Sequence, residues 1–441
     1  MRVSQVHINW HSAQQEPHRW REVGRRLRTL LSAVALLSAA LAVPTVAAPP
    51  GPAQAASAAD CALPGPSTPS AREHPGMLTD YEGRWKDPIG NHRGIVLFVD
   101  FSNAIGDPVH IPSLRSLYAP AAGWFDISSY GRTKLDVTWD SQWRRMPLES
   151  DDYHDPEKSV TSTFDRHRTF MKAAVTAADP YVDFTGYDFV YVIVPPDLFN
   201  SNFHSAAYIT WASSTSDFLD TAEGSPRLGV TLGSGVEQGQ RLFVHETAHL
   251  FGLPDLYSLT PEGHGSYAAL GGWDLMSMTS SNAPDHLAWQ KWKLGWLDNS
   301  QVYCMDTHAR KTWTLTPLHA SGGPKMAVVR TAPNRAVVVE YRATGGPIDG
   351  NPGRVSVPGC FQPGVLVYTV DANLAGLQEP IKAIDAEPMP NTGDHCPPDQ
   401  LQLSDATMVS LQQAVIDPES GVEVRLTGIG SGTRTVQVSW P

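Results

Sequence analysis

The stretch that most restricts the fold of this chain is FVHETAHLFGLPDLY, residues 243–257. Its two histidines, His245 and His249, are four positions apart, and Glu246 directly follows the first. Residues four apart on an α-helix lie on one face, so the spacing predicts a helix with both imidazoles on the same side. Two neutral imidazoles on one turn can hold a Zn²⁺ ion, and a glutamate beside them can act on a water as general base. We therefore predict zinc as the cofactor, with these two histidines as ligands and Glu246 as a catalytic residue.

The continuation of this stretch predicts a third ligand. Gly252 can adopt the left-handed conformation that ends a helix, and Pro254 prevents the helix from resuming. The chain must then reverse, which brings Asp255 back toward the histidines with a carboxylate that suits zinc. The alternative is a more distant carboxylate, Asp274 or Asp285, with Asp255 orienting a histidine instead.

The first 55 of the 441 residues predict an export signal. Arginines precede an apolar run at 30–43, and small residues follow up to Ala55. This order is typical of a secretory signal peptide, through the general or the twin-arginine route, and predicts an extracellular protein. The alternative is an N-terminal membrane anchor, which the short, Ala-rich run disfavours. We expect no membrane association after cleavage.

Net charge narrows the class of partners. The leader carries six arginines and two glutamates, so its removal takes the net charge from −12 to −16. A surface that acidic disfavours nucleic acid and anionic lipid as partners. Hydrophobic residues make up 41% of the chain, enough to bury a sizeable core.

The four cysteines predict disulfides rather than a metal cluster. None of them has CxxC spacing, and an even number in an exported chain favours two bridges. Of the three connectivities, we favour Cys61–Cys304 with Cys360–Cys396, because the second pair closes a short, turn-rich loop.

After the leader at 1–55, the pattern along the chain divides the remainder into three parts. Residues 56–92 are rich in Ala, Pro, Gly and Ser and predict a linker or short pro-segment. Residues 93–297 contain strand-like runs at 93–101, 133–143 and 187–196, a helical run at 169–180, and the histidine motif. Residues 298–441 hold strand-like runs separated by Gly, Pro and Asp, which predicts a β-rich C-terminal domain.

Several segments together resemble a known family. HETAHLFGLPDLY is followed by LGGWDLMSM at 270–278 and HLAWQKWKLGWL at 286–297. These segments resemble the immune inhibitor A-like family of secreted bacterial zinc metallopeptidases, which shows HExxHxxGxxD, then W-x-L-M-S, then a helix ending in Leu-Gly-Trp. The likeness covers residues 93–375 and includes GIVLFVDFSN at 94–103 and the stretch at 124–147.

The resemblance implies a fold and an activity. It implies an α+β protein with a zincin-type catalytic domain, a mixed sheet plus an active-site helix, followed by the β-rich C-terminal portion. The implied activity is a zinc metalloendopeptidase that hydrolyses extracellular proteins or peptides. His245, His249 and Asp255 match the metal positions, Glu246 matches the catalytic glutamate, and Met276 matches a methionine that forms a floor beneath the metal.

Peptide hydrolysis also needs a hydrogen-bond donor for the oxyanion. The candidates are Tyr257, His264 and Tyr267, of which we favour Tyr267 as a catalytic residue.

Two other features have simpler interpretations. The acidic stretch SDDYHDPEK at 150–158 is a candidate for structural Ca²⁺, but it lacks the D-x-D-x-D-G spacing, so a solvated loop is preferred. Trp289, Trp292 and Trp296 follow helical spacing and predict a buried face, with Lys291 and Lys293 at its rim.

Two other functions stay open on sequence alone. The first is a catalytically inactive secreted zincin whose β-rich part binds cell-wall or matrix polymers. The second is a zinc hydrolase that does not act on peptides. The presence of Glu246 favours an active peptidase over the inactive form.

Overall fold

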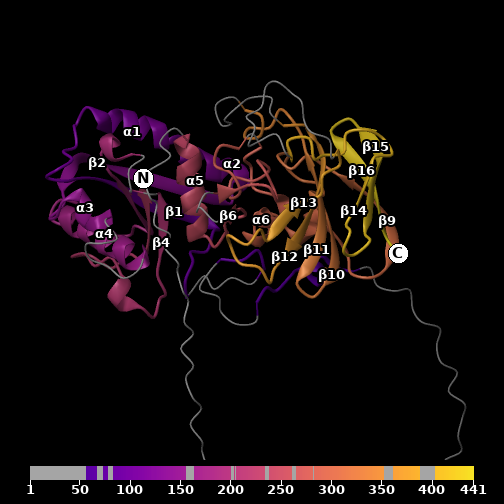
Figure 1. Cartoon of the computed structure of the whole chain (residues 1–441), viewed down its shortest axis with the longest axis horizontal. Coiled ribbons are helices and arrows are strands. Elements are labelled where there is room, and N and C mark those ends of the chain that lie inside the picture. The colour runs from indigo at the N-terminus through magenta and orange to yellow at the C-terminus, as the bar shows by residue number, and fades with distance from the viewer. Residues whose placement is uncertain are drawn as a thin grey trace, which may run out of the picture. The chain divides into compact units, whose positions relative to one another are not determined.

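The protein is a mixed α/β structure with several β-sheets, few helices and a β-rich C-terminal part (Figure 1). The computed structural model describes residues 56–66, 73–77, 83–154, 163–199, 203, 205–233, 238–260, 265–281, 283–351, 361–387 and 403–441. Ala55–Pro441 form one compact unit, which includes the predicted boundary at 297/298. The predicted signal peptide and the Cys360–Cys396 bridge lie outside the described residues. No described helix has the length and apolar character needed to span a bilayer.

The first half is built on a five-stranded sheet in the order β2-β1-β3-β5-β4. Four of its strands are parallel, and β4 pairs antiparallel with β5 at the edge. The strands are β1 (Gly90–Asp100), β2 (Thr133–Arg145), β3 (Phe189–Ile193), β4 (Ala206–Ile209) and β5 (Leu228–Leu232). The helices of this half are α1 (His110–Tyr118), α2 (Pro120–Ser128), α3 (Ser150–His154), α4 (Thr163–Ala178) and α5 (Gln240–Leu250).

Helices cover both faces of this sheet, so its central strands are apolar without interruption. In β1, Val96 and Phe98 join a hydrophobic cluster with α1, α2 and α5. The alternate residues Ile95 and Leu97 join a second cluster with α3 and α4. All five residues of β3 are buried, as expected for a strand covered on both faces.

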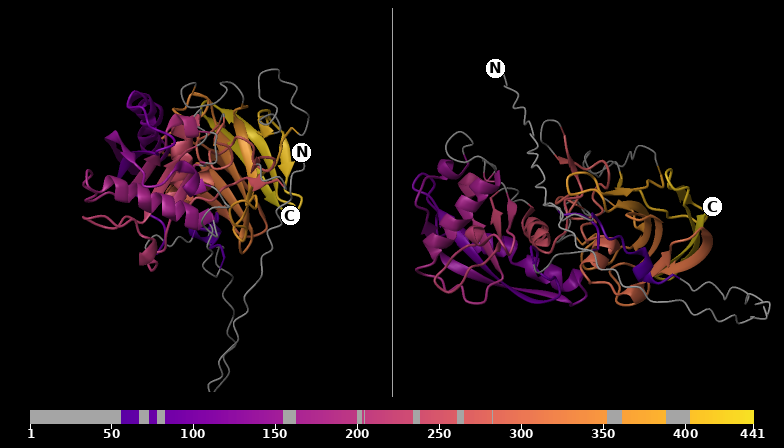
Figure 2. Two further views of the ribbon diagram at one scale, coloured as in Figure 1. Left: turned by 60° about the vertical axis from the view of Figure 1, so that its left-hand side comes forward. Right: turned by 90° about the horizontal axis from the view of Figure 1, so that it is seen from below.

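The C-terminal half contains two sheets that face each other across one core (Figure 2). The first sheet has the order β13-β12-β11-β10-β8 and the second β14-β15-β16-β9. The first comprises β8 (Val302–Met305), β10 (Met326–Ala332), β11 (Arg335–Arg342), β12 (Gly364–Asp371) and β13 (Ile381–Ala383). The second comprises β9 (Ala309–Leu315), β14 (Ala414–Ile416), β15 (Glu423–Gly430) and β16 (Thr433–Trp440). A short hairpin, β6 (Ser258–Leu259) and β7 (Gly265–Ser266), and helix α6 (Ala288–Lys293) lie between the halves in sequence.

The sheet that contains β11 is buried on both sides. Val337 and Val339 contact the second C-terminal sheet, whereas Val338 belongs to the cluster shared with α5 and α6. The C-terminal half therefore packs directly against the half that carries the histidine motif.

The segment before β1 is packed into the fold rather than lying outside it. Cys61, in a short 3-10 helix (Ala58–Cys61), forms the predicted disulfide with Cys304, next to β10. The Pro75 carbonyl accepts a hydrogen bond from the Trp289 indole at 2.8 Å. Removal of this segment as a pro-segment stays a prediction.

The strands and helix expected at 93–101, 133–143, 187–196 and 169–180 are confirmed, and α4 ends two residues before Pro180. The three tryptophans of HLAWQKWKLGWL are buried as expected. The solvated loop expected for the acidic stretch at 150–158 was wrong for residues 150–154, which form α3 because Ser150 and Tyr153 are buried against the fold. The remainder of the stretch lies outside the described residues.

The expectation for the two lysines was wrong, because both are buried rather than at a rim. Lys291 Nζ donates to Asp285 and to the Ser128 carbonyl, and Lys293 Nζ donates to the Gly76 carbonyl at 2.7 Å. Helical spacing cannot reveal this, because the partners come from distant segments.

We expect Lys293 to make stability depend on pH. Burial lowers the pKa of Lys293 to about 7, against the attraction of Glu73. Between pH 7 and the usual value of 10.5, the unfolded chain holds a proton that the folded chain has lost. Stability should therefore rise with pH in this window, relative to Lys293→Met, by about 1.4 kcal/mol per pH unit at most. Urea unfolding from pH 6 to pH 10 measures this, with exposed Lys382→Met as control. Parallel curves for wild type and Lys293→Met would refute it.

Candidate metal centre

Helix α5 presents both histidines of the motif on one side. Its other side packs on the central sheet, where Phe243 stacks on Tyr191 with ring centroids 4.3 Å apart. The Thr247 hydroxyl lies 3.2 Å from the Tyr191 hydroxyl on the same side. One turn apart, the rings of His245 and His249 have centroids 4.9 Å apart and are perpendicular.

The turn after α5 returns the chain as the sequence predicts. The helix ends at Leu250, and Gly252 has a φ of 88°, the left-handed conformation that glycine adopts without strain. The Leu253 amide donates to the Ala248 carbonyl at 3.2 Å, which closes the turn. Asp255 then lies with its Oδ1 atom 3.2 Å from His245 Nε2 and 3.4 Å from His249 Nε2.

Backbone carbonyls fix the orientation of both imidazoles. His245 Nδ1 lies 3.0 Å from the Leu275 oxygen, and His249 Nδ1 lies 2.8 Å from the Leu253 oxygen. A carbonyl can only accept, so each ring carries a proton on Nδ1 and directs Nε2 toward Asp255, and the neutral form of the ring offers the Nε2 lone pair to a metal. Asp255 Oδ1 is buried and faces both Nε2 atoms.

The three facing atoms have the spacing of a tetrahedral metal site. The two Nε2 atoms are 3.3 Å apart, so the sides of the triangle measure 3.2, 3.3 and 3.4 Å. Ligand atoms at about 2.0–2.1 Å from a tetrahedral ion lie roughly 3.3–3.4 Å from each other. The donor set of two imidazoles and one carboxylate therefore fits a divalent zinc-like cation and leaves a fourth position for a water or substrate. Among the described residues, His245, His249 and Asp255 are a group of three side chains whose ligand atoms lie close enough together to hold one metal ion.

The electrostatics of the triad favour a positive charge at its centre. Burial lowers the pKa of each histidine, but the Asp255 carboxylate outweighs it, so that the pKa of His249 is raised to about 10 and that of His245 is also raised. Although burial acts in the opposite direction, the two imidazoles hold the pKa of Asp255 well below its usual range. A divalent cation held between the three groups would take the place of the Nε2 protons and balance the Asp255 carboxylate.

A cleft of about 320 Å³ opens beside the triad and contains Glu246. Burial raises the pKa of the Glu246 carboxyl, whereas the two imidazoles and an amide hydrogen bond from Ala207 lower it. The described residues that line the cleft are Glu73, Arg84, Phe164, Ser205, Ala206, Ala207, Ile209, His245, Glu246, His249, Asp255 and Tyr257. The motif residues therefore share one cleft with edge strand β4.

Of the predicted oxyanion donors, Tyr257 lines the cleft. Its hydroxyl bonds to Asp255, and burial together with the nearby carboxylates raises its pKa, so the hydroxyl keeps its proton. Tyr267 contacts the Tyr257 ring at a centroid distance of 5.9 Å and is not among the cleft residues. His264 lies outside the described residues. A catalytic role for Tyr267 stays a prediction.

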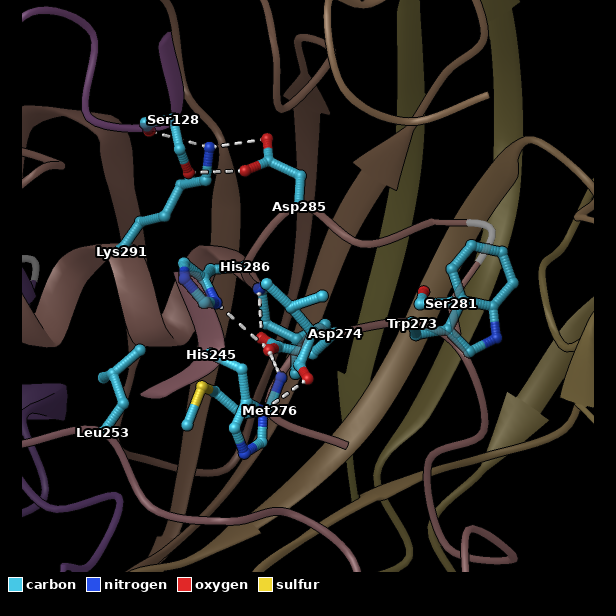
Figure 3. Close-up of polar contacts among 12 residues, drawn as sticks. Ser128, His245, Leu253, Trp273, Asp274, Met276, Ser281, Asp285, His286 and Lys291 are labelled. Carbon is cyan, nitrogen blue, oxygen red and sulfur yellow. Dashed lines mark hydrogen bonds and ion pairs between the residues drawn. The ribbon is translucent and has the colours of Figure 1, made fainter. Parts of the chain in front are cut away.

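The two alternative third ligands have other partners. The Asp285 carboxylate accepts hydrogen bonds from Ser128 and Lys291, and that of Asp274 accepts from the buried ring of His286 (Figure 3). Neither lines the cleft. Met276, the expected floor of the site, is wholly buried in the chain next to Leu275, but its role toward a metal stays a prediction.

Sequence reasoning missed two charged residues of the cleft, Glu73 and Arg84. Both come from the segment predicted to be a linker, and their side chains approach to 3.4 Å. The Arg84 guanidinium lies near the rings of Trp85 and Trp211, 5.0 and 5.2 Å from their centroids. No spacing pattern links these residues to the histidine motif, so only the folded chain brings them together.

Comparison of the sequence with protein-family models found no match, and neither did comparison with curated proteins. The family resemblance therefore stays a prediction, and the interpretation of the site rests on its geometry.

We expect the wild-type protein to bind one Zn²⁺ per chain and Asp255→Ala to weaken binding by more than about 100-fold, since loss of a ligand exceeds the effect of an outer partner. Elemental analysis gives the stoichiometry, and competition with a chelator gives the affinity. The control is Glu73→Gln, which alters a cleft carboxylate outside the triad and should retain zinc. If Glu73→Gln loses zinc and Asp255→Ala does not, the third ligand is not Asp255.

Proposed function

We propose that this protein is a secreted, zinc-dependent endopeptidase of the immune inhibitor A-like kind, with a zincin-type catalytic domain. The observation that carries the proposal is the set of distances between His245 Nε2, His249 Nε2 and Asp255 Oδ1, which match those between three ligands of a tetrahedral ion. These three residues line the same cleft as Glu246. When bound there, Zn²⁺ supplies a water of lowered pKa and polarises the carbonyl of the substrate.

Glu246 is the general base of the proposed reaction. Its carboxylate takes a proton from the attacking water and passes it to the nitrogen of the leaving amine. Burial raises the pKa of this carboxyl, which brings it nearer to the working pH and helps it both to accept and to release the proton.

Edge strand β4 suits a peptide substrate. It is the last strand of its sheet, and its residues Ala206, Ala207 and Ile209 line the cleft that holds Glu246. An extended peptide can pair with an exposed strand edge through main-chain hydrogen bonds, which do not depend on its side chains. This arrangement favours an endopeptidase over a hydrolase that acts on small molecules.

Tyr257 is our preferred donor to the developing oxyanion. Its hydroxyl stays protonated and lies in the cleft next to Asp255, whereas Tyr267 contacts the Tyr257 ring and is not among the cleft residues. A neutral hydroxyl can donate to the negative oxygen that forms on the substrate carbonyl.

The central test is cleavage of a proteome-derived peptide library, followed by mass spectrometry. We expect wild type to cut internal bonds and Glu246→Gln to retain zinc but lose cleavage by about 10²–10⁴-fold or more, because the base is gone. No cleavage by a zinc-loaded wild type would favour the inactive binding protein or a hydrolase of other substrates. Equal cleavage by both forms would show that Glu246 is not the base.

Tyr257→Phe should lower kcat by about 10²-fold, the typical effect of one oxyanion donor, with little change in KM. Because the hydroxyl also bonds to Asp255, zinc affinity is measured as well, and kcat is compared at saturating zinc so that a loss of kcat reports on the oxyanion rather than on metal binding. Steady-state kinetics on a peptide from the library measures both constants, with Tyr267→Phe in parallel. A larger loss of kcat in Tyr267→Phe would restore Tyr267 as the donor.

A further inference from the structure

The Leu275 carbonyl, which accepts the hydrogen bond from His245, lies in a turn that is fixed by several backbone and side-chain hydrogen bonds. Asp274 precedes it, and the backbone oxygen of Asp274 accepts hydrogen bonds from the amides of Ser277 and Met278 at 3.0 and 3.2 Å. These bonds form a tight turn with Leu275 inside it. The direction of its carbonyl, and with it the anchor for His245 Nδ1, depends on this turn.

The Asp274 carboxylate closes the turn from within. Its Oδ1 atom accepts from the Met276 amide at 2.7 Å and lies 3.1 Å from His286 Nδ1, while Oδ2 accepts from the Leu287 amide at 2.7 Å (Figure 3). Asp274 and His286 are both completely buried. His286 Nε2 has no hydrogen-bond partner among the described residues, so the polar contact of this ring is directed at Asp274.

A buried arginine of β11 fixes the two ends of the same loop. Arg342 donates to the Trp273 carbonyl at 3.0 Å, before the turn, and to the carbonyls of Ala283 and Asp285 at 2.8 and 3.0 Å, after it. The turn is thus held to the C-terminal sheet on one side and to the His245 ring on the other.

We propose that Asp274 is a positioning residue for the metal ligand His245, acting through the Leu275 carbonyl. The inference rests on the proposed zinc site. A carbonyl fixed in place keeps the imidazole in one orientation and makes Nε2 a better donor to the metal, and outer partners of this kind are worth about 10–100-fold in metal affinity. Arg342, which holds both ends of the same loop, makes the proposed metal site depend on the C-terminal sheet as well.

The test measures metal binding rather than catalysis. Full-length wild type, Asp274→Asn and the control Asp417→Asn are compared by chelator competition for zinc and by the visible spectrum of bound Co²⁺. Asp417 is a matched control because its buried carboxylate also has hydrogen-bond partners, Arg335 and Ser420, but lies in the C-terminal half outside the cleft. Thermal unfolding of the metal-free proteins reports how much each change destabilises the fold.

Asp274→Asn has one acceptor oxygen in place of two and forces an amide NH₂ against a backbone N–H or His286. We expect its zinc affinity to fall about 10–100-fold and its Co²⁺ spectrum to change. Asp417→Asn should lower thermal stability but leave affinity and spectrum as in wild type. If Asp274→Asn does not fold, His286→Leu removes one donor to the same carboxylate, with a smaller loss of roughly 3–10-fold expected.

Three outcomes would overturn the inference. Unchanged zinc affinity in a folded Asp274→Asn, or in His286→Leu if that variant replaces it, shows that the carboxylate does not position His245. An equal loss of affinity in Asp417→Asn assigns the effect to general destabilisation. Failure of wild type to bind zinc overturns both this inference and the proposed function, whereas the first two outcomes leave the proposed function intact.

Discussion

The hydrogen bonds and ion pairs of the Arg342 guanidinium are the polar contacts on which the packing of the two halves of this protein depends. It is completely buried, and it pairs with Glu340 and Asp349 as well as with three backbone carbonyls of the loop after Trp273. A buried charge is tolerated only when its donors are satisfied, and loss of a partner typically costs about 3–5 kcal/mol. The loop that carries Leu275 is therefore held by the C-terminal sheet, and through it the candidate metal centre is tied to β-strands far along the chain.

The need to satisfy buried polar groups also explains why the candidate site contains residues from several distant segments. Helix α5 supplies two imidazoles, the loop after it supplies Asp255, and β4 lines the adjoining cleft. Glu73 reaches the cleft from a segment that a disulfide at Cys61 attaches to the C-terminal half. A polar cleft inside an apolar body needs partners for every buried polar group, and one helix cannot provide them all.

Local chemistry made part of this predictable. His245 and His249 could be placed together because helical geometry alone fixes side chains four residues apart, and Gly252 marked the turn that returns Asp255. The central strands were predictable because strands covered on both faces are continuously apolar, and α4 was predictable because a helical run ends before Pro180. The predicted rim position of Lys291 and Lys293 was wrong because their burial depends on Asp285 and on the Gly76 carbonyl, and a helical pattern reveals neither partner.

The sequence by itself determined the types of the candidate ligands, the helix that carries two of them, the glutamate beside them and the β-rich character of the C-terminal half. Only the tertiary structure decided that Asp255 rather than Asp274 or Asp285 faces the histidines, that Tyr257 lines the cleft and that Glu73 and Arg84 join it. The reason is physical: short-range geometry follows from the backbone of one element, whereas contacts between distant segments are selected by which packing buries the apolar surface and still satisfies every buried charge.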